Sequence, residues 1–155
     1  MTINQVELKE CFSLFATGVM IATTNVEGKN YGLTINSFSS VSMDPPLCLF
    51  SIGSESYNLD FFKKSKSFAL NILSTDQLGL AKDFAAHNCS SKWNKESFNI
   101  SGEGNPIFTN SNGYLECTKH QVIEAGDHHI FIGEVVDCGK LSDGDGLVYY
   151  KGGFC

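Results

Sequence analysis

The sequence lacks arginine, and all eleven basic residues among its 155 are lysines. Any phosphate group must therefore be held by lysine, hydroxyl and backbone N–H groups, because the bidentate guanidinium fork is missing. Positive charge is also scarce overall, since the formal net charge is -6 at pH 7. Non-specific nucleic-acid binding needs clustered positive charge, so this composition argues against a nucleic-acid partner.

Long apolar runs are missing as well. The N-terminal segment carries Glu7, Lys9 and Glu10 where a secretory signal would have its apolar region. No apolar run approaches the roughly 18 residues that a membrane-spanning helix needs. We therefore expect a cytoplasmic protein without membrane contact.

Paired cysteine motifs are absent, although the chain has six cysteines. Their spacing is wide and uneven, and without a secretory signal this favours free thiols over disulfides. Cys117 and His120 form a lone C-x-x-H with no second half, so we predict no metal site. The six cysteines are Cys11, Cys48, Cys89, Cys117, Cys138 and Cys155.

The common nucleotide and hydrolase motifs are absent too. Neither a G-x-G-x-x-G after a strand nor a G-x-x-x-x-G-K-[ST] occurs, so no Rossmann or P-loop site is indicated. No G-x-S-x-G elbow of a hydrolase is present. The D-G-D-G run at residues 143–146 resembles the start of a calcium loop, but its glycine is misplaced and no glutamate closes it. We predict an exposed turn there.

Hydrophobic patterning predicts a mainly β fold with short helices in a single domain, residues 1–155. Ser54 or Ser56 is expected to cap the second helix, residues 87–112 and 138–146 are expected to be irregular, and Asn112-Gly113 is expected to form a turn. Linkage makes the strands mostly antiparallel, and closure into a small barrel would remove sheet edges. Strands are expected at residues 19–24, 31–47, 47–52, 68–73, 114–124, 129–136 and 147–150, and helices at 5–15, 56–64 and 75–86.

The strand expected at residues 31–47 is unusually rich in hydroxyl and amide groups and carries no charge between Lys29 and Asp44. Alternation along a strand would place Thr34 and Asn36 on one face and Ser37 on the other. Such side chains supply donors and acceptors that suit the edge of a flat heteroaromatic ring. The alternative interpretation is a polar, solvent-facing surface of an edge strand.

Residues 51–56, SIGSES, run from a strand end into an expected helix start. Hydroxyls and free N–H groups at a helix N-terminus can bind an anion without arginine. Simple capping of the helix by serine explains the same residues, and the two roles share one geometry.

Two further segments carry candidate functional groups. His128 and His129 stand at a strand entrance, where they could line a nicotinamide site, act as an acid, or be inert. A metal site would need a third ligand that the spacing does not offer. Near the C-terminus, Tyr150 could pack in the core or at the surface, while Lys151, beside glycines, could reach a ligand or a dimer interface.

These pieces, in this order, resemble the flavin reductase family with the FMN-binding split-barrel fold. The resemblance covers nearly the whole chain, and the combination of the second and fifth segments below is specific. The matching segments are F-A-T-G-V at 15–19, G-L-T-I-N-S-F-S-S-V-S-M-D-P-P-L at 32–47, F-A-L-N-I-L at 68–73, L-x-x-x-F-A at 80–85, G-D-H-x-I-F-I-G-E-V at 126–135 and L-V-Y-Y-K-G-G-F at 147–154.

The resemblance implies a homodimeric split β-barrel that transfers hydride from NADH or NADPH to FMN or FAD. It also implies a flavin-dependent monooxygenase as a possible partner that receives reduced flavin. Family members often carry an arginine shortly before the phosphate-proximal serines, and its absence here leaves FMN or FAD open. A second interpretation is a protein that holds FMN tightly as an electron carrier or sensor, without NAD(P)H turnover.

The resemblance also implies roles for individual residues. His128 is the catalytic candidate and is expected to position the nicotinamide rather than to donate a proton. The other implied residues are Thr34, Ile35, Asn36 and Ser37 at the isoalloxazine ring, Ser51, Ile52, Gly53, Ser54 and Ser56 near the ribityl and phosphate groups, Phe84 and Ala85 beside the flavin, and Tyr150 and Lys151 in the family's Y-[RK]-G ending.

Overall fold

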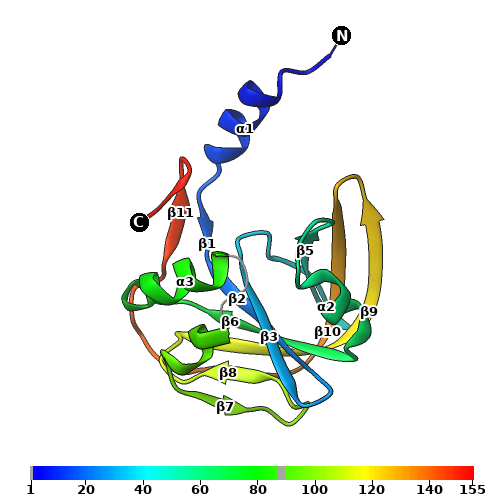
Figure 1. The fold of residues 1–155 in the computed structure, drawn as a ribbon, viewed down its shortest axis with the longest axis vertical. Coiled ribbons are helices and arrows are strands. Elements are labelled where there is room, and N and C mark those ends of the chain that lie inside the picture. The colour runs from blue at the N-terminus through cyan, green and yellow to red at the C-terminus, as the bar shows by residue number, and fades with distance from the viewer. Residues whose placement is uncertain (1, 87–89) are drawn as a thin grey trace.

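The computed structural model describes residues 2–86 and 90–155, and it is mainly β with short helices, as predicted (Figure 1). Its main sheet has seven strands in the order β3-β2-β6-β9-β10-β5-β4, and all neighbours are antiparallel. The strands are β2 (Met20–Val26), β3 (Lys29–Ile35), β4 (Ser39–Met43), β5 (Pro46–Gly53), β6 (Ser67–Ile72), β9 (Gly113–Ala125) and β10 (His128–Lys140).

The two edge strands of this sheet, β3 and β4, follow one another directly in the sequence. Because an extended chain spans at most about 3.3–3.6 Å per residue, the short connection at 36–38 forces the sheet to curl until its edges approach. Ser37 holds this connecting segment against β5, because its Oγ accepts a hydrogen bond from the Ser51 N–H at 2.9 Å. Within the described residues no ladder joins β3 to β4, so the barrel closes only partially.

The prediction of one continuous strand at 31–47 is therefore wrong. The chain leaves the sheet after Ile35 and re-enters it at Ser39 on the opposite edge. Asn36 lies outside β3, so it does not share a pleated face with Thr34 as expected. A polar alternation of period two cannot distinguish one strand from two strands that a crossing segment separates.

Strand β2 begins with apolar residues on both of its faces because it contributes to two cores. Met20 and Ala22 join a cluster inside the curled sheet, where the Phe50 ring centroid lies 5.0 Å from that of Phe68 and 5.5 Å from that of Phe131. Val19, just before the strand, and Ile21 face a second cluster outside it, which includes Phe84 and Phe108. Successive side chains of a strand point to opposite faces, which explains the split. Strand β2 therefore contributes side chains to both hydrophobic clusters.

The helices are shorter than expected. Helix α1 is Gln5–Ser13, and α2 is Leu59–Lys64, which begins after the turn in which the Ser56 Oγ accepts a hydrogen bond from the Asn58 N–H at 3.2 Å. Neither serine caps α2, so the predicted capping is wrong. The predicted helix at 75–86 consists of a 3₁₀ turn, η1 (Thr75–Gln77), and α3 (Leu78–Ala85).

The segment expected to be irregular at 87–112 contains short elements: η2 (Ser90–Asn94), β7 (Phe98–Ile100) and β8 (Pro106–Phe108). Its first part, 87–89, lies outside the described residues. The expected loop at 138–146 is also partly strand, because β10 continues to Lys140 in its ladder with β9. Near the C-terminus, β11 (Val148–Tyr150) pairs with β1 (Thr17–Gly18) and β12 (Gly153–Phe154).

Five cysteines are free thiols, as predicted, and Cys89 lies outside the described residues. Across the described chain, no helix is long and apolar enough to cross a bilayer. Helix α1 projects from the body near the N-terminus (Figure 1), and none of its residues is buried.

Candidate functional site

Three adjoining cavities follow the edge of the sheet where β3 ends, and we call the row the groove. The first, the His128 cavity, has a volume of about 480 Å³ and is bounded by the ends of β3, β5 and α3. The second, the Tyr149 cavity, measures about 270 Å³ and shares Thr34 and Ala85 with the first. The third, the Phe15 cavity, measures about 240 Å³ and shares Val19, Ile35 and Asn36 with the second.

Thr34 stands where the first two cavities meet. Its Oγ1 donates a hydrogen bond to the Ala81 carbonyl at 2.6 Å, which holds α3 against β3. The last turn of that helix then presents Phe84 and Ala85 to the groove. The hydroxyl proton is thus used inside the protein, and only the oxygen lone pairs remain for a ligand.

The serine-rich segment after β5 forms the opposite wall of the His128 cavity. The Ser54 N–H donates to the Asp127 carbonyl at 2.8 Å, and the Ser56 N–H donates to the Gly53 carbonyl at 3.0 Å. These bonds make a tight turn that places Gly53, Ser54 and Ser56 on the cavity. Because α2 starts only at Leu59, the serines lie in this turn rather than at a helix N-terminus.

His128 is exposed and its imidazole is oriented by its neighbour. Nδ1 lies 2.8 Å from the Asp127 Oδ1, and this bond holds the pKa of the Asp127 carboxyl below its ordinary value. An ionised carboxylate accepts the Nδ1 proton, which leaves Nε2 as the acceptor of the neutral ring. Nε2 faces Gly53, where an added Cβ would lie 3.8 Å away.

His129 has a different position. It is 8% exposed, and its Nδ1 lies 3.4 Å from the Ser54 Oγ. Adjacent residues of a strand point to opposite faces, so only His128 lines the cavity. The residue pattern alone left the two histidines equivalent, and the position of His128 agrees with the choice that the family resemblance implied.

The structure brings most of the predicted site residues to the groove, but not all. Ile52 is 1% exposed and packs in the inner core, and Ser37 and Ser51 bond to each other behind the groove. The Lys151 N–H bonds to the Ser13 carbonyl at 2.9 Å. The predicted residues that line the groove are Thr34, Ile35, Asn36, Gly53, Ser54, Ser56, Phe84, Ala85 and His128, and those that do not are Ser37, Ser51, Ile52, Tyr150 and Lys151.

Sequence reasoning missed several lining residues. Tyr149, not Tyr150, faces the groove together with Phe154, whose ring centroid lies 5.2 Å away. Period-two alternation along residues 147–150 could have indicated that only one tyrosine faces inward. Tyr57 and Asn58 also line the His128 cavity, and they lie in a segment that was expected to be helical.

The groove suits a flat, uncharged ring with a polar tail. Among the described residues, the section around Thr34, Ile35 and Asn36 contains no charged side chain, so a neutral heterocycle can bind there without desolvating an ion. In the part of the lining that the structure describes, charges appear only at the far end, on Glu55, Asp127 and His128 when protonated. The volume of the His128 cavity falls within the roughly 300–1,000 Å³ typical of small-molecule sites.

Residues 12–155 match the protein family described as flavin reductase like domain. The chain belongs to this family. A flavin reductase of Pseudomonas putida is 35% identical over 90% of this chain and 82% of its own length. The reductase component of a flavin-dependent trigonelline monooxygenase of Acinetobacter baylyi is 37% identical over 96% of this chain and 47% of its own length.

Solved structures place this flavin reductase domain in the same family. The NADH:FAD oxidoreductase SgcE6 of Streptomyces globisporus, solved in complex with NAD and FAD fragments, superposes with a TM-score of 0.92 at 31% identity. The match covers 98% of this chain and 92% of that one. The chain spans about half the length of some curated relatives that it matches, including the Acinetobacter reductase component.

Proposed function

We propose that the protein is an NAD(P)H-dependent flavin reductase that binds FMN or FAD in the groove. The observation that carries this proposal is the uncharged section around Thr34, Ile35 and Asn36, which links two cavities and lies within reach of His128. The SgcE6 complex with NAD and FAD fragments supports it, since that protein shares the fold along nearly the whole chain. Flavin supplies the chemistry when bound, because it accepts a hydride from the nicotinamide.

Each wall of the groove has a separate task in this proposal. Thr34 and Asn36 bind the polar edge of the ring, and Phe84 with Ala85 excludes water from its side. Ser54 and Ser56 bind the ribityl and phosphate groups through their hydroxyls, because no arginine is available. His128, oriented by Asp127, positions the nicotinamide.

The predicted residues behind the groove act indirectly. Ser37 and Ser51 hold the segment at 36–38 against β5 through their paired hydrogen bonds, and Ile52 fixes β5 from the core. Tyr150 and Lys151 lie on the hairpin that also carries Tyr149 toward the groove. We propose that they place this hairpin rather than touch the flavin within one chain.

Anaerobic stopped-flow absorbance tests the function directly. Mixing the protein with NADH and FMN should bleach the flavin band, and His128→Ala should raise the apparent KM for the nicotinamide about tenfold, which corresponds to about 1.4 kcal/mol of binding. The kcat should change little, because a positioning contact is lost and no proton donor is removed. His120→Ala, on an exposed position of β9, is the matched control.

Absence of bleaching with either nicotinamide and either flavin would contradict the reductase. A protein that remains yellow after dialysis and does not turn over NADH would instead be a flavin carrier. An unchanged KM in His128→Ala would remove only the role of that residue.

We further propose that the protein is a homodimer assembled through α1. Phe12 is 71% exposed and Phe15 is 78% exposed, and Met43 on the edge strand β4 is 91% exposed. No residue of α1 is buried, and short isolated helices are only marginally stable in water. Packing against a partner subunit would therefore stabilise this helix. Phe15 also lines the Phe15 cavity, so a partner covering it would help to close the groove.

Sedimentation equilibrium tests the dimer. The native chain should sediment as a dimer, and Phe12→Ser with Phe15→Ser should weaken association by about 1.5–3 kcal/mol per phenylalanine. Lys9→Ser on the same helix should leave the dimer intact. A native monomer at micromolar concentration, or a double variant that dimerises as tightly, would rule this interface out.

Several further proposals follow from the relatives. Since the Acinetobacter relative is named as a reductase component of a monooxygenase, we propose that reduced flavin passes to a partner monooxygenase. The groove offers no arginine for a 2′-phosphate, which favours NADH over NADPH. We also propose that residues 1–155 fold as one domain and act in the cytoplasm.

A further inference from the structure

One hydroxyl in the lining of the groove is buried without a hydrogen bond. In the part of the chain that the structure describes, the buried side-chain atoms without a partner are Thr17 Oγ1 and Asn112 Oδ1. Asn112 lines none of the three cavities of the groove, whereas Thr17 lines the Phe15 cavity. Native proteins rarely leave a buried hydroxyl unpaired, because desolvation without a hydrogen bond is unfavourable. The Thr17 hydroxyl therefore needs a partner that the described residues do not supply.

Thr17 is held on the groove side by the pairing of β1 with β11. It stands directly opposite Tyr149 in this antiparallel ladder. Residues directly opposite one another in such a pair have their side chains on the same face. Tyr149 lines the Tyr149 cavity and Thr17 lines the adjoining Phe15 cavity, so both side chains face the same groove.

The rest of the Phe15 cavity is mostly apolar. In its described lining, which encloses about 240 Å³, Thr17 and Asn36 carry the only polar side chains. Asn36 also lines the Tyr149 cavity, so it stands at the boundary between the two. A ring whose polar edge binds Asn36 therefore lies next to the space that Thr17 faces.

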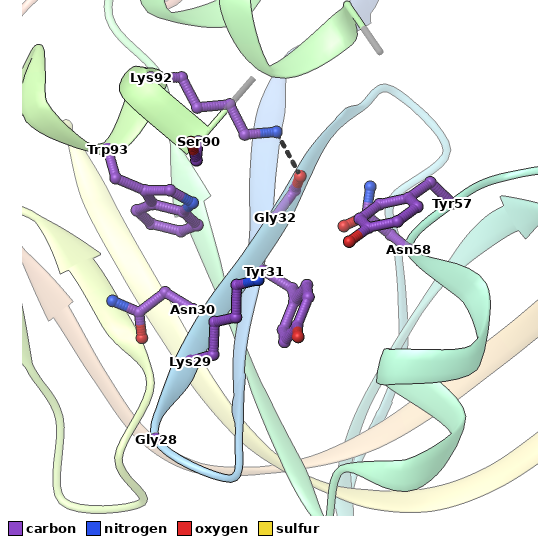
Figure 2. Close-up of a pocket in the computed structure, with 10 residues that line it drawn as sticks. All are labelled: Gly28, Lys29, Asn30, Tyr31, Gly32, Tyr57, Asn58, Ser90, Lys92 and Trp93. Atoms are coloured by element: carbon purple, nitrogen blue, oxygen red, sulfur yellow. Dashed lines mark hydrogen bonds between the residues drawn. The ribbon is translucent and has the colours of Figure 1, made fainter. Parts of the chain in front are cut away.

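The other side of β3 offers no comparable unpaired atom. Figure 2 shows a cavity on this outer side, which shares Tyr57 and Asn58 with the His128 cavity. There the Lys92 ammonium donates a hydrogen bond to the Gly32 carbonyl at 3.2 Å. Among the described lining residues of that cavity, no buried side-chain oxygen or nitrogen lacks a partner. The unpaired hydroxyl is thus specific to the groove.

Thr17 complements Thr34 as a hydrogen-bonding group. The Thr34 hydroxyl donates its proton to the Ala81 carbonyl, so toward a ligand it can only accept. The Thr17 hydroxyl has no such acceptor, so it can donate. Asn36, whose amide has both a donor and an acceptor, lies between them along the row of cavities. A heterocyclic edge with N–H and C=O groups needs both kinds of partner.

We propose that Thr17 is a further ligand-binding residue of the groove, whose hydroxyl donates a hydrogen bond to a carbonyl oxygen of the ring bound beside Asn36. A flavin carries such a carbonyl on its ring and a nicotinamide carries one in its carboxamide, so the shared chemistry is an uncharged carbonyl acceptor. The inference rests on the proposed reductase function, because it adds a contact to a ring that the groove holds in that proposal.

Titration with riboflavin, followed by the fluorescence of the flavin itself, tests this contact on a ligand that has the ring and lacks the phosphate. Thr17→Val removes the hydroxyl and keeps the size of the side chain. It should weaken riboflavin affinity about three- to tenfold, as expected for the loss of one hydrogen bond. Thr17→Ser keeps the hydroxyl and should recover most of the affinity.

Steady-state kinetics distinguish the two sources of the carbonyl. If the carbonyl belongs to the nicotinamide, riboflavin affinity should stay the same in Thr17→Val, and the KM for NADH at saturating FMN should rise by a similar factor. If it belongs to the flavin, the riboflavin affinity falls and the KM for NADH stays the same. Either outcome supports the proposal.

Urea unfolding without ligand gives a second readout, which a purely structural role would move in the opposite direction. Removing a hydroxyl that has no partner leaves nothing unpaired, so the urea midpoint of Thr17→Val should stay the same or rise. Thr23→Val is the matched control, because Thr23 is fully buried and its Oγ1 donates to the Pro106 carbonyl at 2.6 Å. Its urea midpoint should fall, since that carbonyl loses its closest donor.

Three results would overturn the assignment of Thr17. The first is a Thr17→Val variant with unchanged riboflavin affinity and unchanged KM for NADH. The second is a urea midpoint of Thr17→Val that falls as far as that of Thr23→Val. The third is a weaker dimer in Thr17→Val with unchanged ring affinity, which would assign the hydroxyl to a contact with the partner subunit.

FMN reduction by NADH is measured on the native chain in the same series. If the native chain reduces FMN while Thr17→Val gives any of these three results, the role of Thr17 is refuted and the reductase function stands. If the native chain neither binds riboflavin nor reduces FMN, the reductase function is refuted and the assignment of Thr17 fails with it.

Discussion

Truncation of Phe84 to alanine is expected to lower the free energy of unfolding by about 3–5 kcal/mol and to abolish most flavin binding. Phe84 is 2% exposed, and its ring meets Trp93 at 4.9 Å and Phe108 at 5.4 Å between centroids. The buried ammonium of Lys92 also lies over the face of the Phe84 ring, with its Nζ 4.4 Å from the ring centroid. The variant leaves an empty space beneath that charge, and α3 loses the largest of its buried side chains.

This loss is large because a domain of this size has only about 5–15 kcal/mol of stability in total. The same side chain lines the His128 cavity, so loss of packing and loss of the flavin wall coincide. Urea unfolding followed by Trp93 fluorescence and titration with FMN would measure the two effects separately.

Phe84→Leu is the matched variant for this prediction. Leucine keeps most of the buried volume and removes the aromatic face, so stability should fall by only about 1–1.5 kcal/mol. If Phe84→Ala were as stable as the native protein, the packing described between α3 and the outer core would be incorrect.

Replacing Gly133 with alanine is expected to destabilise the protein by about 1–3 kcal/mol or more, through overpacking. Gly133 lies in β10 at a register shift, between strands β9 and β5. A Cβ added there would lie 2.5 Å from Phe68 Cζ and 2.7 Å from Cys117 Cβ, and both neighbours are fully buried. Neither can withdraw without disturbing the inner aromatic cluster.

Gly79→Ala is the control, because a Cβ on this residue of α3 would meet nothing within 4 Å. Removing a glycine from a helix should stabilise the protein by about 0.5–1 kcal/mol. Phe68→Leu combined with Gly133→Ala should recover part of the loss, which a double-mutant cycle would reveal as coupling. A cycle without coupling would mean that the steric conflict lies elsewhere.

The inner cluster connects these stability predictions to the site. Phe50 and Ile52 on β5 pack inside the sheet, while Gly53, at the end of the same strand, lines the His128 cavity. Any shift of β5 therefore moves the turn that carries Ser54 and Ser56. We expect core variants along β5 to affect flavin binding before they unfold the protein.

Much of this protein could be predicted from the sequence alone. The hairpin of β9 and β10 and the apolar start of β2 follow from the pattern of apolar residues, which is the main secondary-structure signal in a sequence. The uncharged run containing Thr34 and Asn36 was a candidate ligand-binding segment by its composition, and the role of His128 was implied by the resemblance to the flavin reductase family. Those residues do line the groove.

Other features depended on tertiary structure. The strand predicted at 31–47 divides because curling brings β3 and β4 to opposite edges, and no local pattern encodes which edge a strand joins. The choice of His128 over His129 and of Tyr149 over Tyr150 depends on which face of a strand meets the groove. A shift of one residue in register reverses that choice.

The sequence by itself therefore determined the residue types available at the site, the lack of arginine and the order of the main strands. Tertiary structure alone decided that the ends of β3, β5 and α3 meet around one groove, and that Trp93 stands beside β3 at its continuation. The physical reason is that composition and periodicity are local properties of the chain. Cavities arise between elements far apart in sequence, where packing leaves space that no single segment specifies.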